Sequence, residues 1–168
     1  KGIILKMYAE VDYEKLGYQK FHLLLLLDDS KRARHKDLMK KIEDHPNFLR
    51  VMEFSDNWDF EIVLLAKSLR EFDKIVHGLL DPFEDIVLRK DLEAVIDVHT
   101  RKSFPEVAKL GLKRVVEKVK NHGPYDCDKH DLKILSLLCE DARISTYKMA
   151  EKVKLGADAI GLRIKKLH

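Results

Sequence analysis

Three short helical patterns fill residues 125–167, and two tight breaks separate them. The first pattern follows Asp128, the second follows Ser145, and the third follows a turn at residues 154–156. Asp and Ser favour the position just before a helix, because their side chains accept hydrogen bonds from the free amides of the first turn. Three short helices so arranged are typical of a helix-turn-helix, which suits contact with a DNA major groove and leaves little room for a catalytic pocket.

Apolar side chains recur at helical spacing within these patterns, which predicts one buried stripe on each helix. In the first helix we expect this stripe to consist of Leu132, Leu135, Leu138 and Cys139. In the third helix we expect it to consist of Ile160, Ile164 and Leu167. Arg163, Lys165 and Lys166 fall outside the third stripe, so we expect them to face DNA, mostly as phosphate contacts. Gly161 costs this helix about 1 kcal/mol relative to Ala, and Asp158 either repels a phosphate or caps the helix.

Before residue 106 the pattern alternates between strand-like and helix-like segments. We expect strands at residues 20–28, 48–54 and 60–66, helices at 34–44 and 69–80, and a last strand or hairpin at 86–100. This order predicts an α+β, ferredoxin-like βαββαβ domain with an antiparallel sheet and both helices on one face. The other face would be left open in a single copy, so we predict a homodimer through it.

Composition is that of a globular protein, with 45% apolar and 36% charged residues. The longest apolar run, residues 23–27, is far shorter than the roughly 20 residues of a membrane helix, and no basic-then-apolar leader opens the chain. We therefore expect a cytoplasmic protein with no membrane partner. Cys127 and Cys139 would lie about 18 Å apart along one helix and are expected to be free thiols. The two cysteines and eight histidines show no zinc-type spacing, so no metal or cofactor is predicted.

A domain boundary is predicted at residues 122–124 (HGP), which break an amphipathic helix expected over residues 106–121. The net charge is +3, and residues 126–168 hold nine basic and seven acidic side chains. A polyanion would therefore bind in the last third of the chain. The excess is small, and a solvated helical surface would show it equally well.

The three helical patterns resemble the helix-turn-helix of the Lrp/AsnC family of transcription regulators. The family pattern has an Asp-x-x-Asp opening, an Ile-Leu pair, an Asp-x-Arg-Ile-Ser step and a closing Arg-Ile-x-x-Leu. In this chain the matching residues are Asp128, Asp131, Ile134, Leu135, Asp141, Arg143, Ile144, Ser145, Arg163, Ile164 and Leu167. Residues 1–18 resemble the wing and linking strand that follow this motif in the family, and residues 20–100 resemble its ligand-sensing domain.

This resemblance implies a DNA-binding transcription regulator with four parts. They are a wing and linking strand at residues 1–17, a ligand-sensing and dimerisation domain at 18–105, a connecting helix at 106–124 and the helix-turn-helix at 125–168. The implied partners are double-stranded DNA and a homodimer or a higher even oligomer. The implied DNA contacts are Ser145, Thr146, Ala157, Asp158, Arg163, Lys165 and Lys166.

Small effectors bind in the family near a Gly-x-x-Asp step in the hairpin between the second and third strands. The resemblance therefore implies an effector site at Asp56, Asn57, Trp58 and Asp59. Asp56 takes the place of the glycine, which argues against the same close backbone approach if that residue needs a positive φ. Hairpin packing and a turn hydrogen bond are the alternative roles of Trp58 and Asp59.

The order of the parts is rotated, because the family's helix-turn-helix comes first and here it comes last. We expect the chain to be the middle of a tandem protein, and a truncated chain would give the same sequence. Residues 156, 157 and 159, which are often Ser or Thr in the family, are here Gly, Ala and Ala. With fewer hydroxyl groups to bind phosphate, affinity for DNA would depend on the cations and fall steeply with salt.

Two other functions stay open on the sequence. The chain could be an assembly or sensor module whose degenerate helix-turn-helix does not bind DNA. It could also be a relative of the haem-biosynthetic decarboxylases, which share this architecture and whose anionic tetrapyrrole would need histidines such as His22, His77 and His99 in one cleft. No spacing unites these histidines, and no pair of acidic residues is spaced for general acid–base catalysis. We therefore do not expect an enzyme.

Overall fold

The computed structural model describes residues 6–55, 57–96 and 125–168, and these fall into two units. One unit, the sheet unit, holds residues 17–55 and 57–96. The other, the helical unit, combines residues 6–16 with residues 125–168. The helix predicted at residues 106–121 and the strand residues predicted beyond residue 96 lie outside the described residues.

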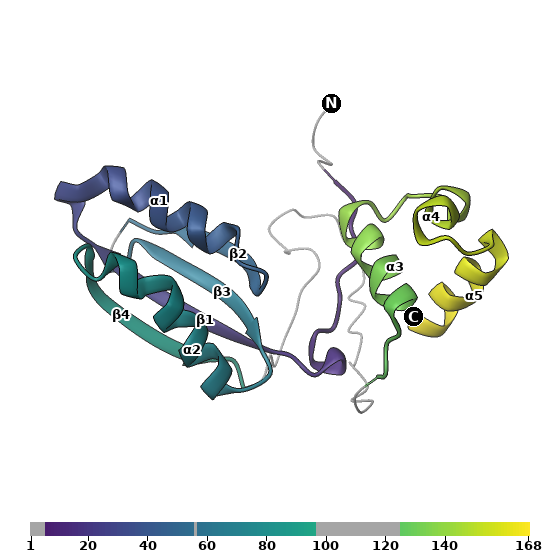
Figure 1. The fold of residues 1–168 in the computed structure, drawn as a ribbon, viewed down its shortest axis with the longest axis horizontal. Helices are drawn as coiled ribbons and strands as arrows, with labels where there is room; N and C mark the ends of the chain where they lie inside the picture. The colour runs from purple at the N-terminus through teal and green to yellow at the C-terminus, as the bar shows by residue number, and fades with distance from the viewer. Residues whose placement is uncertain (1–5, 56, 97–124) are drawn as a thin grey trace, which may run out of the picture. The chain divides into compact units, whose positions relative to one another are not determined.

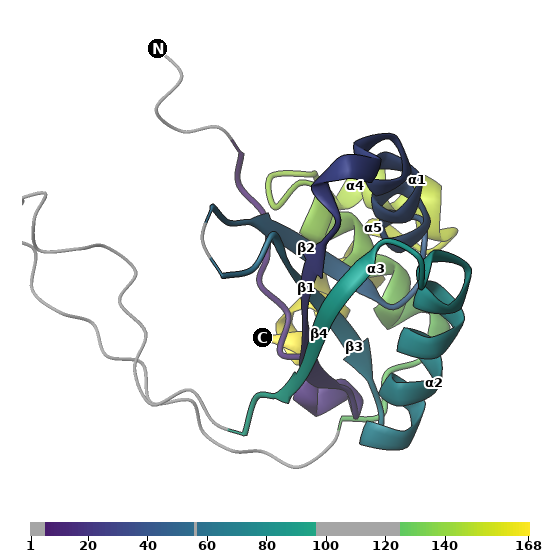
Figure 2. The ribbon, with the colours of Figure 1, turned by 90° about the vertical axis from the view of Figure 1, so that its left-hand side faces the viewer.

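The sheet unit has the predicted order strand, helix, strand, strand, helix, strand (Figure 1). Its elements are β1 (Gln19–Leu27), α1 (Arg32–Glu43), β2 (Phe48–Glu53), β3 (Phe60–Ala66), α2 (Leu69–Leu80) and β4 (Val87–Ala94), with short 3-10 turns at Asp29–Lys31 and Asp81–Phe83. The strands form one antiparallel sheet in the order β2-β3-β1-β4. Both helices lie on the same side of this sheet (Figure 2). The predicted α+β, ferredoxin-like fold is confirmed.

The core of this unit lies between the sheet and its two helices. Along β1 the burial alternates, so that Phe21, Leu23, Leu25 and Leu27 are buried under the helices. Phe21 stacks on Phe72 of α2 with ring centroids 4.6 Å apart. Leu24 and Leu26 point to the opposite face, where they are only half-buried. That second side is not covered by a helix of the sheet unit.

The helical unit contains α3 (Lys129–Glu140), α4 (Thr146–Val153) and α5 (Ala157–Leu167). The predicted caps are confirmed, since Asp128 accepts hydrogen bonds from the amides of residues 130 and 131 and Ser145 accepts one from residue 148. In the turn after α4, Lys154 adopts left-handed angles with φ of 62°. The three helices enclose a small core of Ile134, Leu137, Met149, Val153 and Ile160.

The predicted buried stripe of α3 is wrong at Leu132 and Leu135, whereas Leu138 packs against the core of the helical unit as predicted. Ile134 and Leu137 face α4 and α5, whereas Leu132 is 48% exposed and Leu135 is only half-buried. Helix α3 carries apolar residues on more than one face, so periodicity alone could not choose between them. The predicted stripe of α5 holds, because Ile160 is buried and Ile164 and Leu167 pack against the same core.

Residues 6–16 form backbone hydrogen bonds with residues of the helical unit at the other end of the chain, and they run beside α3 (Figure 1). The amide of Ala9 donates to the carbonyl of Leu138 at 3.0 Å, and the amide of Ala142 donates to the carbonyl of Met7 at 3.0 Å. The amide of Tyr125 donates to the carbonyl of Lys15 at 2.7 Å. The carbonyls in the last turn of a helix lack partners within the helix. Ala9 therefore satisfies one such group of α3.

Both cysteines are free thiols, as predicted. Burial raises the pKa of the Cys139 thiol. No helix in the described parts of the chain has the length and apolar character to cross a bilayer.

Candidate DNA-binding site

The predicted DNA-contacting residues lie in helices α4 and α5 and at Ser145, the cap of α4. Ser145 precedes α4 and Thr146 begins it, while Ala157 and Asp158 form the start of α5. Asp158 does not cap α5. Gly156 occupies the capping position, no side chain makes a capping hydrogen bond there, and Asp158 lies exposed in the first turn.

Arg163 is bound by two carboxylates and does not present a free guanidinium. Its Nη1 atom donates hydrogen bonds to Asp128 Oδ2 and to Asp131 Oδ1, each at 2.6 Å. Asp131 is only 3% exposed. This corrects the expectation that Arg163 points outward. Because Arg163 lies beside the buried stripe of α5, its side chain points toward the N-terminus of α3.

The same two carboxylates form the capping box of α3, in which each side chain accepts from the backbone amide of the other residue. The amide of Asp131 and the guanidinium of Arg163 hold the pKa of Asp128 below its ordinary value. Hydrogen bonds to Asp131 and Asp128 raise the pKa of Arg163. Charge-assisted hydrogen bonds of this kind are stronger than neutral ones. Arg163 therefore connects α5 to the start of α3.

Of the two predicted lysines, Lys166 is also engaged within the unit. Its ammonium nitrogen lies 5.2 Å from the centre of the Tyr125 ring, within the range of a cation–π contact. Lys165 is exposed and forms no ion pair with the described residues. Exposed lysines on or after α4, namely Lys148, Lys152 and Lys154, add positive charge to the same unit.

The outward stripe of α5 consists of Asp158, Gly161, Leu162 and Lys165, which recur at helical spacing opposite the buried residues. Leu162 is 69% exposed. Leu162 was not among the predicted site residues. The signal was present, because positions 158, 161, 162 and 165 lie opposite the apolar stripe of residues 160, 164 and 167.

The predicted effector residues follow β2 and precede β3. Asp56 lies outside the described residues. The Asp59 carboxylate accepts a hydrogen bond from the amide of Leu27 at 2.6 Å, which ties the hairpin to the end of β1. The Arg89 guanidinium lies 4.5 Å from the centre of the Trp58 ring. Trp58 and Asp59 therefore both contact other strands of the sheet unit, and effector binding stays a prediction.

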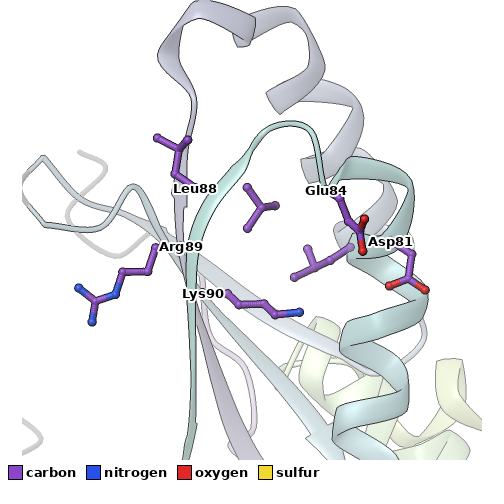
Figure 3. Close-up of a pocket in the computed structure, with 7 residues that line it drawn as sticks. Asp81, Glu84, Leu88, Arg89 and Lys90 are labelled. Carbon is purple, nitrogen blue, oxygen red and sulfur yellow. The ribbon is translucent and has the colours of Figure 1, made fainter.

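A pocket of about 270 Å³ lies between β4 and the turn that follows α2 (Figure 3). Lys90 points toward the side of the pocket where Asp81 and Glu84 lie, whereas Arg89 points away (Figure 3). The volume is below the range of about 300–1,000 Å³ usual for small-molecule sites. The carboxylates and the ammonium are solvent-exposed. This pocket therefore gives no basis for a catalytic site.

The histidines proposed for a tetrapyrrole are not brought together. His22 points to the face of the sheet opposite the helices, where it pairs with Glu61, and His77 lies on α2 with its Nδ1 2.8 Å from the carbonyl of Asp73. His99 lies outside the described residues. Within residues 6–55, 57–96 and 125–168, no group of three or more His, Cys, Asp or Glu side chains is placed to hold a metal ion.

Known proteins were compared with this chain by sequence and by fold. The model of the AsnC-type helix-turn-helix domain matches residues 128–168. No curated protein sequence matches the chain.

Three solved structures of regulators share the fold. An AsnC-family transcriptional regulator from Agrobacterium tumefaciens has a TM-score of 0.53 at 12% identity, over 65% of this chain and 71% of its own. AsnC from E. coli has a TM-score of 0.52 at 14% identity, over 61% and 68%. A transcriptional regulator from Neisseria meningitidis, solved as a complex with L-Met, has a TM-score of 0.51 at 18% identity, over 65% and 71%.

The sequence match identifies residues 128–168 as an AsnC-type helix-turn-helix. The three solved structures share the fold of the chain. The confirmed capping residues Asp128 and Ser145 lie at positions of the family pattern. The chain therefore carries an AsnC-type helix-turn-helix at residues 128–168 and has the fold of the Lrp/AsnC regulators, with the helix-turn-helix in the rotated, C-terminal position.

Proposed function

We propose that the chain is a transcription regulator that binds double-stranded DNA through α4 and α5. The observation that carries this proposal is the AsnC-type helix-turn-helix at residues 128–168, with Asp158 and Leu162 exposed on the outward side of α5 and exposed lysines on α4 and at Lys165. The second helix of such a motif lies in the major groove in known complexes. As a regulator of transcription, the chain would work in the cytoplasm.

Binding to labelled genomic fragments, measured by fluorescence anisotropy at several salt concentrations, tests the proposal. Lys165→Ala should weaken binding to all fragments alike and reduce the slope of log affinity against log salt by about one. Lys36→Ala on α1 removes the same charge from the sheet unit and is the matched control. If no fragment binds at low salt, or if both variants weaken binding equally, DNA binding by α5 is refuted.

A protein-binding module is the second candidate, because Arg163 is occupied and large apolar side chains are exposed on the helical unit. Tyr147 is 76% exposed and Leu162 is 69% exposed. A module that binds a protein partner in place of DNA would give no anisotropy change with any fragment. The same titration therefore separates the two functions.

A homodimer through the open face of the sheet is part of the proposal. Leu24, Met52 and Leu65 share this face with the contact between His22 and Glu61, and the three apolar side chains are half-buried in a single copy. A second copy would cover them and give the two helical units that a two-fold symmetric DNA site needs.

Effector binding at residues 56–59 stays a prediction. The Asp59 carboxylate already accepts the amide of Leu27, so a ligand there would have to add to that contact or replace it. Isothermal titration of the chain with each of the twenty amino acids tests the prediction. No heat with any of them would argue against amino-acid sensing.

A further inference from the structure

The outward face of α5 has few groups that can form hydrogen bonds with bases. Base pairs are distinguished in the major groove mainly by hydrogen bonds, and an arginine that binds guanine is the commonest contact. Arg163 is held by Asp128 and Asp131, so it is not available in this arrangement. The other residues of the outward stripe are Asp158 with its carboxylate, Lys165 with its ammonium, the apolar Leu162, and Gly161, which has no side chain.

The packing of the helical unit does not explain why residue 161 is a glycine. A Cβ atom added at this position would meet nothing within 4 Å, and its φ is not positive. Glycine inside a helix is nevertheless unfavourable, because it costs more backbone entropy than alanine. The absence of a side chain at residue 161 leaves the helix backbone open to close approach from outside the unit, as it also does at Gly78 of α2.

Leu162 lies next to this bare position and is 69% exposed. Its side chain can neither donate nor accept a hydrogen bond. The apolar group that base edges offer in the major groove is the C5-methyl of thymine. Gly161 and Leu162 are the fifth and sixth of the eleven residues of α5, and the N-terminal part of a recognition helix is the part that contacts bases.

We propose that Leu162 gives this helix-turn-helix a preference for thymine through contact with its C5-methyl group, and that Gly161 allows the backbone approach which this contact needs. The inference rests on the proposed function and names the base feature that the same site selects. Lys165, one helical turn from both residues, would bind phosphate and add no preference among bases.

The first test removes only the methyl groups from the DNA. The full chain is used to select duplexes from a random-sequence library, and a selected duplex is then compared with a copy in which uracil replaces every thymine. Loss of one buried methyl contact should weaken binding of the unchanged protein about fourfold. Leu162→Ala should bind the two duplexes equally. Leu132→Ala, which shortens another exposed leucine of the helical unit, should keep the fourfold difference.

The second test uses two glycine substitutions that are matched in structure. Gly161→Ala should raise the melting temperature of the helical unit, because alanine favours the helix, and should weaken binding to the selected duplex about tenfold. Gly78→Ala on α2 also adds a methyl group in open space and should leave DNA affinity unchanged.

The possible outcomes distinguish failure of the thymine contact from failure of DNA binding itself. Equal affinity for the thymine and uracil duplexes, or a difference that persists in Leu162→Ala, overturns the thymine contact while DNA binding stands. Unchanged affinity in Gly161→Ala overturns the close approach. A chain that enriches no duplex overturns the proposed function and this inference together.

Discussion

At the scale of single residues, Arg163 has the most consequential contacts in the helical unit. It bonds to two carboxylates, one of which, Asp131, is almost fully buried. A buried carboxylate that loses its partner keeps the cost of its lost hydration. Arg163 should therefore contribute more to the stability of the helical unit than to DNA binding.

Arg163→Ala should lower the melting temperature of the helical unit by several degrees, more than Lys165→Ala does, as measured by circular dichroism. Arg163→Lys should lie between the two, because an ammonium cannot bond to both carboxylates with the geometry of a guanidinium. An unchanged melting temperature in Arg163→Ala, together with a reduced salt slope of DNA binding, would show that Arg163 contacts phosphate instead.

The capping carboxylate Asp128 should also make the stability of the unit depend on pH. Its folded-state pKa is lowered, first by the amide of Asp131 and then by Arg163. A group with a lowered folded-state pKa stabilises the fold above its unfolded pKa, here about 3.9, and loses that contribution as the pH falls further. Asp128→Asn keeps a good cap but cannot ionise. Between pH 4 and pH 2 this variant should lose less stability in urea titrations than the unchanged chain.

Residue-scale features were predictable where they depend only on neighbours in the sequence. The caps at Asp128 and Ser145 are of this kind, since a side chain there bonds to amides two or three residues further on. The partners of Arg163 are more than 30 residues away. They follow from the rotation of α3 about its axis, which apolar periodicity could not fix because α3 has more than one apolar face.

At the scale of elements, Ser145 has two roles that substitution can separate. Ser145→Ala should cost about 1 kcal/mol of stability through loss of the cap. Ser136→Ala, an exposed position within α3, should cost nothing measurable and is the control. Ser145→Asp should keep the cap while adding a negative charge that weakens DNA binding. Urea unfolding and anisotropy on the three variants measure the two effects, and a destabilised Ser145→Asp would contradict this separation.

The segment at residues 6–16 is an element of the helical unit although it lies at the opposite end of the sequence. Ala9→Pro removes the amide that bonds to Leu138, so it should destabilise the helical unit by about 1–3 kcal/mol. Ala9→Gly keeps that amide and is the matched control. Hydrogen exchange should then show faster exchange in α3 of the proline variant and unchanged exchange in β1 and β3. Unchanged exchange in α3 would mean that the contact contributes little.

The elements of the sheet unit were predicted to within a few residues, because strand alternation and helical spacing are local patterns. The last strand is an exception, since the pattern at residues 86–100 allowed a long strand or a hairpin and β4 is a single strand that ends at Ala94. The contacts of residues 6–16 with α3 were not predicted. Met7, Ala9, Val11 and Tyr13 alternate along the sequence as in a strand, but this local pattern does not identify a partner, and the partners come from the far end of the chain.

At the scale of the whole molecule, the proposed dimer depends on the face of the sheet that the helices leave open. Leu24→Asp would place a charge within that interface and should weaken dimerisation by on the order of 100-fold. Leu69→Asp, which adds the same charge at the exposed start of α2, should leave it unchanged. Sedimentation velocity over a range of concentrations measures both. If Leu24→Asp dimerises like the unchanged chain, the open face is not the interface.

The contacts of residues 6–16 with residues 125–168 have a further consequence for how the chain holds together. The helical unit combines residues 6–16 with residues 125–168, so the sequence of the sheet unit is inserted within the sequence of the helical unit. A single break of the peptide chain between residues 97 and 124 would leave two fragments still attached by hydrogen bonds such as that between Ala9 and Leu138. Such a nicked protein would migrate as one particle under native conditions and as two polypeptides in detergent.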